Sequence, residues 1–251
     1  IIENDLCKWF ANEVGFGTSS GGIAASGGTL NNLNALVCAK FNSGLTFEPE
    51  ASFIISEDAH VSFKKCARIL GVKDENLISI GTDNYGKMDI SHLKNEIKKS
   101  KSLGKKIFSI VATFGTTIRG SIDPIYEIGT ICKNNNIWMH IDGSIGGIFA
   151  ISNYIFQNIY EMDKFNIANS ITINPQKILG ITKTSSLLLV DDINKLKKTF
   201  STGLPYIDSG EDVLNRGELG VQGSRPAEII KLWLGLKFLG KNGIDNILSS
   251  S

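Results

Sequence analysis

The chain has 251 residues, of which 42% are hydrophobic and 20% are charged, and its formal net charge is +1 at pH 7. This length fits one large α/β domain or a domain and a half, and the composition makes a sizeable core available. The small net charge argues against a nucleic-acid partner bound by bulk electrostatics. No run of apolar residues in the sequence is long enough to span a bilayer, so we expect no membrane association.

The four cysteines are scattered, without the CxxC spacing of metal and redox sites: Cys7, Cys38, Cys66 and Cys132. This pattern argues against a disulfide framework and against a zinc site, so we expect no metal. Free cysteines are typical of a reducing compartment, and we predict a cytoplasmic protein. The residues around each cysteine indicate buried helix faces.

The first part of the chain predicts two helices separated by a glycine-rich stretch. The first helix extends to about Glu13 and the second covers Asn31 to Phe41. Residues 15–29 lie between them, and their glycines allow the backbone to approach a ligand closely. Because the free N–H groups and the dipole of a helix N-terminus attract anions, the stretch ending at Thr29 is a candidate phosphate site. A flexible loop is the alternative.

The rest of the chain alternates short apolar strands with helices. Strands are predicted at 52–56, 77–80, 107–113, 137–142, 171–173 and 185–190, and helices at about 60–70, 90–101, 125–134, 192–200 and 225–239. Residues 201–223 are predicted to form a mobile loop. The alternation indicates a mostly parallel sheet with right-handed crossovers, in which ligands bind at the carboxyl ends of the strands.

Polar side chains lie at the ends of four predicted strands: His60, Thr116 with Thr117, Asp142 and Lys177. A lysine just past a buried strand becomes a nucleophile when desolvation lowers its pKa. Each residue also has a structural interpretation when taken alone. His60 could cap a helix or fill the core, Asp142 could cap a turn, and Lys177 could point to water.

Together, a phosphate site, an aspartate and a lysine are the parts that a pyridoxal phosphate (PLP) site requires. PLP is an electron sink bound as a Schiff base to a lysine, with a carboxylate partner for its ring nitrogen. An ionised Asp142 would keep that nitrogen protonated, and His60 could lie flat on the ring.

Six segments in order resemble motifs of the group II PLP-dependent amino-acid decarboxylases, which include aromatic amino acid, glutamate, cysteine sulfinate and diaminobutyrate decarboxylases. The segments are Ser26–Leu33 (SGGTxxNL), Ser56–Ser62 (SEDAHxS), Ala112–Thr117 with Gly120–Pro124 (ATxGTT…GSIDP), Trp138–Asp142 (WxHVD), Asn174–Lys177 (NPHK), and Arg225 with Lys231–Trp233 (GRRxDxxKLW). Each motif is weak alone, but six in order are very specific, and they cover nearly the whole chain.

The resemblance implies an α/β fold of the PLP-dependent transferase type (fold type I), with residues 1–251 as the PLP-binding large domain. An N-terminal segment and the family's C-terminal small domain are expected to be missing from this chain. The implied activity is decarboxylation of a small L-amino acid to an amine and CO2 through a Lys177 Schiff base. Asp142 would pair with the ring nitrogen, and His60 would stack on the ring.

Further roles follow from the same resemblance. Gly28 and Thr29 would bind the phosphate, Thr117 would contact the cofactor, and Asn174 would lie close to it. Arg225 would bind the carboxylate of the substrate, for which a guanidinium group is well shaped. The family's active site lies at a subunit interface, so a homodimer is also implied.

The sequence departs from the family motifs at several positions. Gln176 replaces a histidine, Gly143–Ile145 replaces Ala-Ala-Tyr, and Pro226 replaces a second arginine. Several family members carry a catalytic tyrosine on the mobile loop, whereas no tyrosine lies between 207 and 222, and Tyr206 precedes this range. Two alternatives therefore stay open: an oxidative, aldehyde-forming relative, and a truncated homologue that binds PLP or a partner without turnover.

Overall fold

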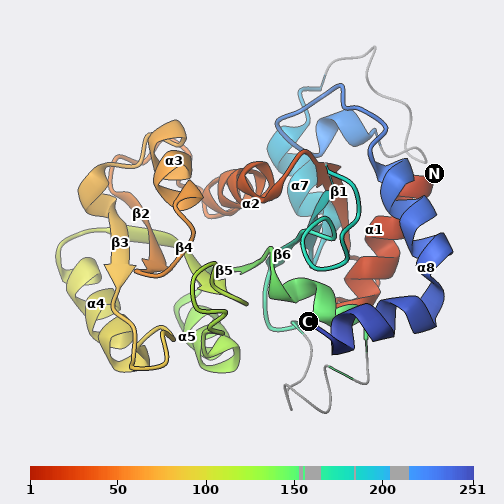
Figure 1. Ribbon diagram of the computed structural model, residues 1–251. Coiled ribbons are helices and arrows are strands. Elements are labelled where there is room, and N and C mark those ends of the chain that lie inside the picture. Colours follow the sequence, from red (N-terminus) through yellow and green to blue (C-terminus); the bar gives the residue numbers. More distant parts are fainter. Residues whose placement is uncertain (153–154, 156–164, 184, 204–214) are drawn as a thin grey trace.

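A computed structural model describes residues 1–152, 155, 165–183, 185–203 and 215–251 of the chain (Figure 1). At its centre is a seven-stranded sheet with the strand order β1-β7-β6-β5-β4-β2-β3. The strands are β1 (Gly21–Ala25), β2 (Ala51–Ser56), β3 (Leu77–Ile80), β4 (Lys106–Thr113), β5 (Trp138–Gly143), β6 (Ser170–Ile173) and β7 (Ser186–Val190). Five neighbouring strands of the sheet are parallel to one another: β3, β2, β4, β5 and β6. In contrast, β7 is antiparallel to both of its neighbours, β6 and β1. The predicted mostly parallel sheet is confirmed.

Helices cover both faces of this sheet. In the described part of the chain they are α1 (Ile2–Glu13), α2 (Gly28–Asn42), α3 (Ser62–Ile69), α4 (Ile90–Ser102), α5 (Ile125–Asn135), α7 (Ile193–Phe200) and α8 (Ile229–Ser249). Short 3₁₀ turns occupy Asp74–Asn76, Gly146–Ile151 and Arg216–Glu218. Figure 1 shows α8 running beside α1 at one end of the molecule, with α3 and α4 at the other.

Two hydrophobic cores lie on opposite faces of the sheet. One core, which includes Ile54 and Met139, packs against α1, α4, α5 and α8. The other, which includes Phe53 and Trp138, packs against α2, α3 and α7. Neighbouring residues of one strand enter different cores because side chains alternate between the faces of a strand. The strands therefore read as continuous apolar runs, as expected for a sheet covered on both sides.

The strand β1 was not predicted, because its glycines are typical of a loop. In the sheet these glycines allow a close approach of β7. A Cβ atom on Gly22 would lie 2.1 Å from the carbonyl oxygen of Leu188, so the two strands can pair here only with glycine at this position. The glycine-rich stretch thus contains an edge strand followed by the N-terminus of α2, which begins at Gly28 rather than at Asn31.

The prediction that the cysteines lie on buried helix faces is confirmed: Cys7, Cys38, Cys66 and Cys132 are all buried and located on helices, and all four are free. Among the helices that the structure describes, none is both long and apolar enough to cross a membrane. The same residues contain no group of three or more His, Cys, Asp or Glu side chains that could hold a metal ion.

The topology gathers the candidate site residues at one edge of the sheet. Because β2, β4, β5 and β6 are parallel neighbours, their carboxyl ends lie together. These ends lead to His60, Thr117, Asp142 and Lys177, respectively. The fold therefore places side chains from distant parts of the sequence where α/β sheets bind their ligands.

Candidate active site

A cavity of about 660 Å³ lies between these strand ends and the N-terminus of α2. Seven of the eight residues to which the family resemblance assigns a role line it: Gly28, Thr29, His60, Thr117, Asp142, Asn174 and Lys177. The eighth, Arg225, lines a neighbouring cavity. A helix N-terminus, an imidazole, a carboxylate and an amine therefore share one cavity.

The N-terminus of α2 supplies backbone N–H donors. Gly27 is its cap residue and has no side chain to satisfy the first N–H groups, which lack acceptors within the helix. A Cβ atom on Gly28 would lie 2.6 Å from Ser144 Oγ and 2.8 Å from Asn174 Nδ2. A Cβ atom on Gly27 would have no atom within 4 Å. Close packing therefore requires glycine at position 28 but not at position 27.

Asn174 is held in place by buried polar groups from α2 and β7. Ser186 Oγ donates to Asn174 Oδ1 at 2.5 Å, and Asn31 Nδ2 donates to Ser186 Oγ at 2.7 Å. All three side chains are buried. Because Oδ1 of Asn174 is engaged by Ser186, its Nδ2 group is left as a donor beside Gly28.

Asp142 presents a carboxylate that is only 4% exposed. Its Oδ2 atom accepts a hydrogen bond from Asn32 Nδ2 at 3.1 Å, and its Oδ1 atom accepts one from the Ser144 backbone N–H at 3.1 Å. Each oxygen of the Asp142 carboxylate is thus oriented by one donor at the edge of the cavity.

His140 lies two residues before Asp142 on β5, on the same face of the sheet, and is fully buried. Its Nε2 atom is 3.1 Å from Asn32 Oδ1, and its Nδ1 atom is 2.9 Å from Ser170 Oγ. Burial lowers the pKa of His140 to about 4, and Asp142 opposes this shift only in part. The imidazole is therefore neutral near pH 7.

His60 lies in the turn between β2 and α3. Its predicted place in the first turn of the helix is wrong, because α3 begins at Ser62. The Nδ1 atom accepts the Ser62 backbone N–H at 3.2 Å and lies 2.9 Å from the Ser62 hydroxyl. The imidazole thus accepts a hydrogen bond from one of the N–H groups at the start of the helix. Because Nδ1 is the acceptor, the neutral form of the ring carries its proton on Nε2.

Lys177 follows β6 in a turn closed by a hydrogen bond from its own N–H to the Asn174 carbonyl, at 3.0 Å. Although the residue has an exposed surface, burial of its amine lowers the pKa of Lys177, and the Asp142 carboxylate works in the opposite direction. The amine therefore loses its proton more easily than the amine of a fully solvated lysine. A nucleophilic lysine requires this property.

Three residues that depart from the family motifs also line the cavity: Ser144, Ile145 and Gln176. Gln176 Oε1 accepts the Ser185 backbone N–H at 2.6 Å, which joins the turn after β6 to the residue before β7. Ser144 contributes the N–H that binds Asp142. The predicted mobile loop, 201–223, falls partly outside the described residues, and Tyr206 lies outside them.

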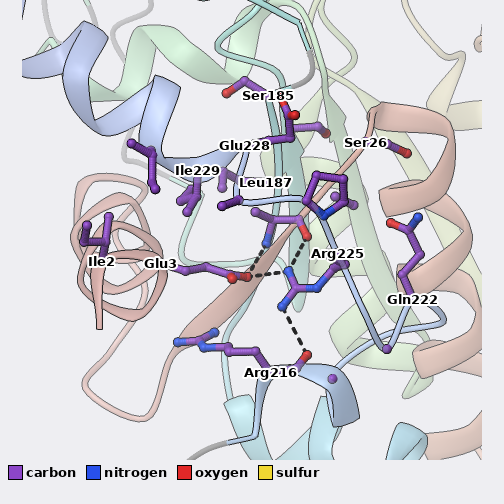
Figure 2. A pocket seen from close by; sticks show the side chains of 18 of the residues that line it. Ile2, Glu3, Ser26, Ser185, Leu187, Arg216, Gln222, Arg225, Glu228 and Ile229 are labelled. Carbon is purple, nitrogen blue, oxygen red and sulfur yellow. Dashed lines mark hydrogen bonds and ion pairs between the residues drawn. The ribbon is translucent and has the colours of Figure 1, made fainter.

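Arg225 is bound to protein groups in the neighbouring cavity of about 630 Å³ (Figure 2). Its Nη1 atom donates to Glu3 Oε1 and to the Ala24 carbonyl, both at 2.6 Å, and its Nη2 atom donates to the Arg216 carbonyl at 3.3 Å. Glu3 Oε1 also accepts the Ala24 N–H at 2.9 Å. The Arg225 and Glu3 side chains are only 12% and 16% exposed. This ion pair joins α1, β1 and the segment before α8.

The comparisons with known proteins identify the family. The pyridoxal-dependent decarboxylase conserved domain matches residues 4–251. The chain belongs to this family. The resemblance inferred from the six motifs is thus confirmed, and pyridoxal 5′-phosphate is the cofactor that the family membership indicates.

Individual relatives agree with this membership. The chain is 33% identical over 237 residues to the acidic amino acid decarboxylase GADL1 of Xenopus tropicalis, covering 89% of this chain and 46% of that protein. It is 32% identical over 249 residues to an aromatic-L-amino-acid decarboxylase of Bacillus atrophaeus, covering 95% and 50%. The crystal structure of mouse CSAD in apo form matches with a TM-score of 0.89 and 29% identity, covering 98% of this chain and 52% of that chain. The chain spans about half the length of these relatives.

The residues of the cavity fit PLP. The uncapped start of α2 and the close approach at Gly28 suit a phosphate group. The Asp142 carboxylate and the Lys177 amine are the two groups that the ring nitrogen and the aldehyde of PLP require.

The sequence did not single out Asn32, His140 or Ser170, although all three are connected to Asp142. One signal was visible: a histidine two residues before the aspartate on an apolar strand must share its face. Asn32 and Ser170 gave no comparable signal, because their contacts join α2, β5 and β6, which only the fold brings together.

We expect Arg225→Met to lower the free energy of unfolding by about 3 kcal/mol, because it leaves the largely buried Glu3 carboxylate without its charged partner. Urea unfolding followed by circular dichroism measures this change. The double variant Glu3→Gln/Arg225→Met should lose less stability than the two single variants together. Unchanged stability of Arg225→Met would show that the ion pair has no structural importance.

We expect the burial of neutral His140 to make the protein sensitive to acid. Its pKa is about 4 in the folded chain and about 6.5 in the unfolded chain, so between these pH values only the unfolded chain binds the proton. The free energy of unfolding should therefore fall as the pH falls from about 6.5 to about 4, by at most about 3 kcal/mol from this residue. Urea titrations across this range should give a shallower loss for His140→Gln; parallel curves would contradict the expectation.

Proposed function

We propose that the protein containing this chain is a PLP-dependent carboxy-lyase that converts an L-amino acid into the corresponding amine and CO2. The observation that carries this proposal is the shared cavity in which the Lys177 amine and the Asp142 carboxylate lie with the uncapped N-terminus of α2. When bound, PLP supplies an electron sink for the electrons left at the α-carbon as CO2 departs.

The phosphate of the cofactor would be held at the start of α2. The N–H groups of Gly28 and Thr29 are the first of the helix, and the helix dipole adds attraction for an anion. The Asn174 amide, oriented by Ser186, offers a further donor beside Gly28. Thr117 lines the same cavity and would contact the cofactor.

Asp142 and His60 would hold the ring of the cofactor. Asp142 would keep the proton on the ring nitrogen, since its carboxylate is buried and hydrogen-bonded. The imidazole of His60 would stack on the ring, in an orientation supported by its bond from Ser62. Lys177 Nζ would hold the cofactor covalently, as the lowered pKa of this amine supports.

Substrate binding by Arg225 is a separate proposal. Its guanidinium group already carries the ion pair with Glu3, so a substrate carboxylate would have to displace Glu3 or bind at Nε, which has no hydrogen-bond partner among the described residues. The two cavities both include Ser26, so they adjoin each other. We propose that a carboxylate reaching Arg225 would enter through this shared boundary.

We also propose a cytoplasmic homodimer with the active site at its interface. Ile118, the residue after Thr117, is 90% exposed, which supports a partner surface beside the cavity. The substrate would be a small L-amino acid. Relatives include one named for acidic and one named for aromatic amino acids, at nearly equal identity, so a panel should contain both classes and diamino acids.

The expected result for Lys177→Ala is loss of the covalent PLP complex. The wild-type protein mixed with PLP should show a visible absorption band that borohydride bleaches, and the variant should lack it, because no other lysine lines the cavity in the described part of the chain. If the variant kept a borohydride-sensitive band, Lys177 would not be the attachment point. Carbon dioxide release from the amino-acid panel then tests turnover, and stoichiometric hydrogen peroxide would instead indicate the aldehyde-forming alternative.

Gly28→Ala and Gly17→Ala form a matched pair. We expect Gly28→Ala to weaken PLP binding about tenfold or more, since its Cβ would crowd Ser144 and Asn174 and displace the N–H groups proposed to bind phosphate. Gly17→Ala, with open space around its Cβ and a position outside the cavity lining, should change binding little. Equal effects of the two substitutions, measured by PLP titration, would argue against a phosphate site at Gly28.

A further inference from the structure

We propose that a one-way chain of hydrogen bonds, running from Trp138 through Ser170, His140 and Asn32, holds the Asp142 carboxylate in the orientation that the cofactor ring nitrogen requires. Asn32 and His140 are then positioning residues, since they act on the cofactor only through Asp142. This inference rests on the proposed function, in which Asp142 pairs with PLP.

The orientation of Asn32 follows from the charge of Asp142. One end of the Asn32 amide lies 3.1 Å from Asp142 Oδ2 and the other lies 3.1 Å from His140 Nε2. The end facing the carboxylate must be the NH₂ group, because an amide oxygen there would face a second acceptor. The amide oxygen therefore faces His140, and Nε2 of His140 must donate to it.

The directions of the remaining hydrogen bonds follow from the neutral state of His140. A neutral imidazole has one N–H group, and here it is on Nε2, so Nδ1 must accept. The donor available to Nδ1 is the Ser170 hydroxyl, at 2.9 Å. Ser170 Oγ in turn accepts the indole N–H of Trp138 at 2.9 Å, and an indole N–H can only donate. Every hydrogen bond in the chain is therefore donated toward Asp142.

Burial strengthens the hydrogen bonds that run from Trp138 to Asp142. The side chains of Asn32, His140, Ser170 and Asp142 are at most 4% exposed, and that of Trp138 is 7% exposed. In such surroundings hydrogen bonds polarise one another, and a donor that itself accepts a hydrogen bond donates more strongly. These hydrogen bonds thus raise the donor strength of the Asn32 amide, which fixes the position of Asp142 Oδ2. With the Ser144 N–H on Oδ1, each oxygen of Asp142 is oriented by one donor.

Asn32→Leu tests the inference, because leucine has a similar size and removes both hydrogen bonds. Thr172→Val is the matched control. Thr172 pairs with Asp142 in the sheet, and its buried hydroxyl has no hydrogen-bond partner among the described residues, so its loss leaves the chain intact. Both variants are made in the full-length protein and compared by PLP titration and by the visible spectrum of bound PLP as a function of pH.

We expect Asn32→Leu to weaken PLP binding about tenfold or more, as for the loss of one hydrogen bond to a charged group. The pKa of the nitrogen that joins PLP to Lys177 should also rise, because a weaker carboxylate partner lets the ring nitrogen lose its positive charge. Thr172→Val should match the wild type. The His140→Gln variant keeps one donor and one acceptor and should give an intermediate shift; it also serves if Asn32→Leu does not fold.

If Asn32→Leu lost stability but kept both its PLP affinity and the pKa of the nitrogen that joins PLP to Lys177, the inference would be overturned. A network with a merely structural role would give that result. A wild-type protein with normal spectra and a variant with identical spectra would overturn it while leaving the proposed function intact. A wild-type protein that forms no borohydride-sensitive complex would overturn the proposed function itself, and this inference with it.

Discussion

A charged carboxylate buried between the sheet and α2 is the feature on which the site depends. An ionised group in such a place is costly unless it is paired or hydrogen-bonded. Asn32 and the Ser144 N–H meet this requirement, and they fix both oxygens of Asp142. The polar residues buried on α2, which include Asn31 and Asn32, are therefore explained by the site that they serve rather than by the packing of a helix.

The parallel arrangement of β2, β4, β5 and β6 is the second constraint. It brings four strand ends to one edge, where α2 begins without a side-chain cap. The same helix thus contributes its free N–H groups at its start and Asn32 slightly further along. One helix can consequently serve both the phosphate end and the ring end of the cofactor proposed for the cavity. The geometry explains why the glycine-rich stretch and the buried asparagines belong to one short segment.

The ion pair of Glu3 with Arg225 has a different role from the cavity. It joins α1 to β1 and to the segment before α8, although the two residues are near opposite ends of the chain. Sequence reasoning assigned Arg225 to substrate binding from its motif alone, because a motif does not reveal which groups surround a side chain. The structure gives the guanidinium three protein acceptors, and any substrate contact at Arg225 has to compete with them.

Much of the fold could be predicted from the sequence. The apolar runs of β2, β4, β5 and β7 and the helices between strands follow from local periodicity, which depends on neighbouring residues only. Likewise, Lys177 and Asp142 could be selected because each ends a buried strand. Local pattern did not predict β1, because its glycines are typical of a loop, although the close approach of Leu188 requires glycine there. It also placed His60 inside the helix, whereas His60 precedes α3 and its ring nitrogen accepts the first N–H of that helix.

The sequence by itself thus determined the family, the mostly parallel sheet and seven of the residues that line the cavity, because motifs and periodicity are properties of contiguous segments. Only the tertiary structure decided which groups support them. The chain from Trp138 to Asp142 joins β5, β6 and α2, and the pair of Glu3 with Arg225 joins segments more than two hundred residues apart. Such contacts depend on distances between elements, which no local pattern encodes.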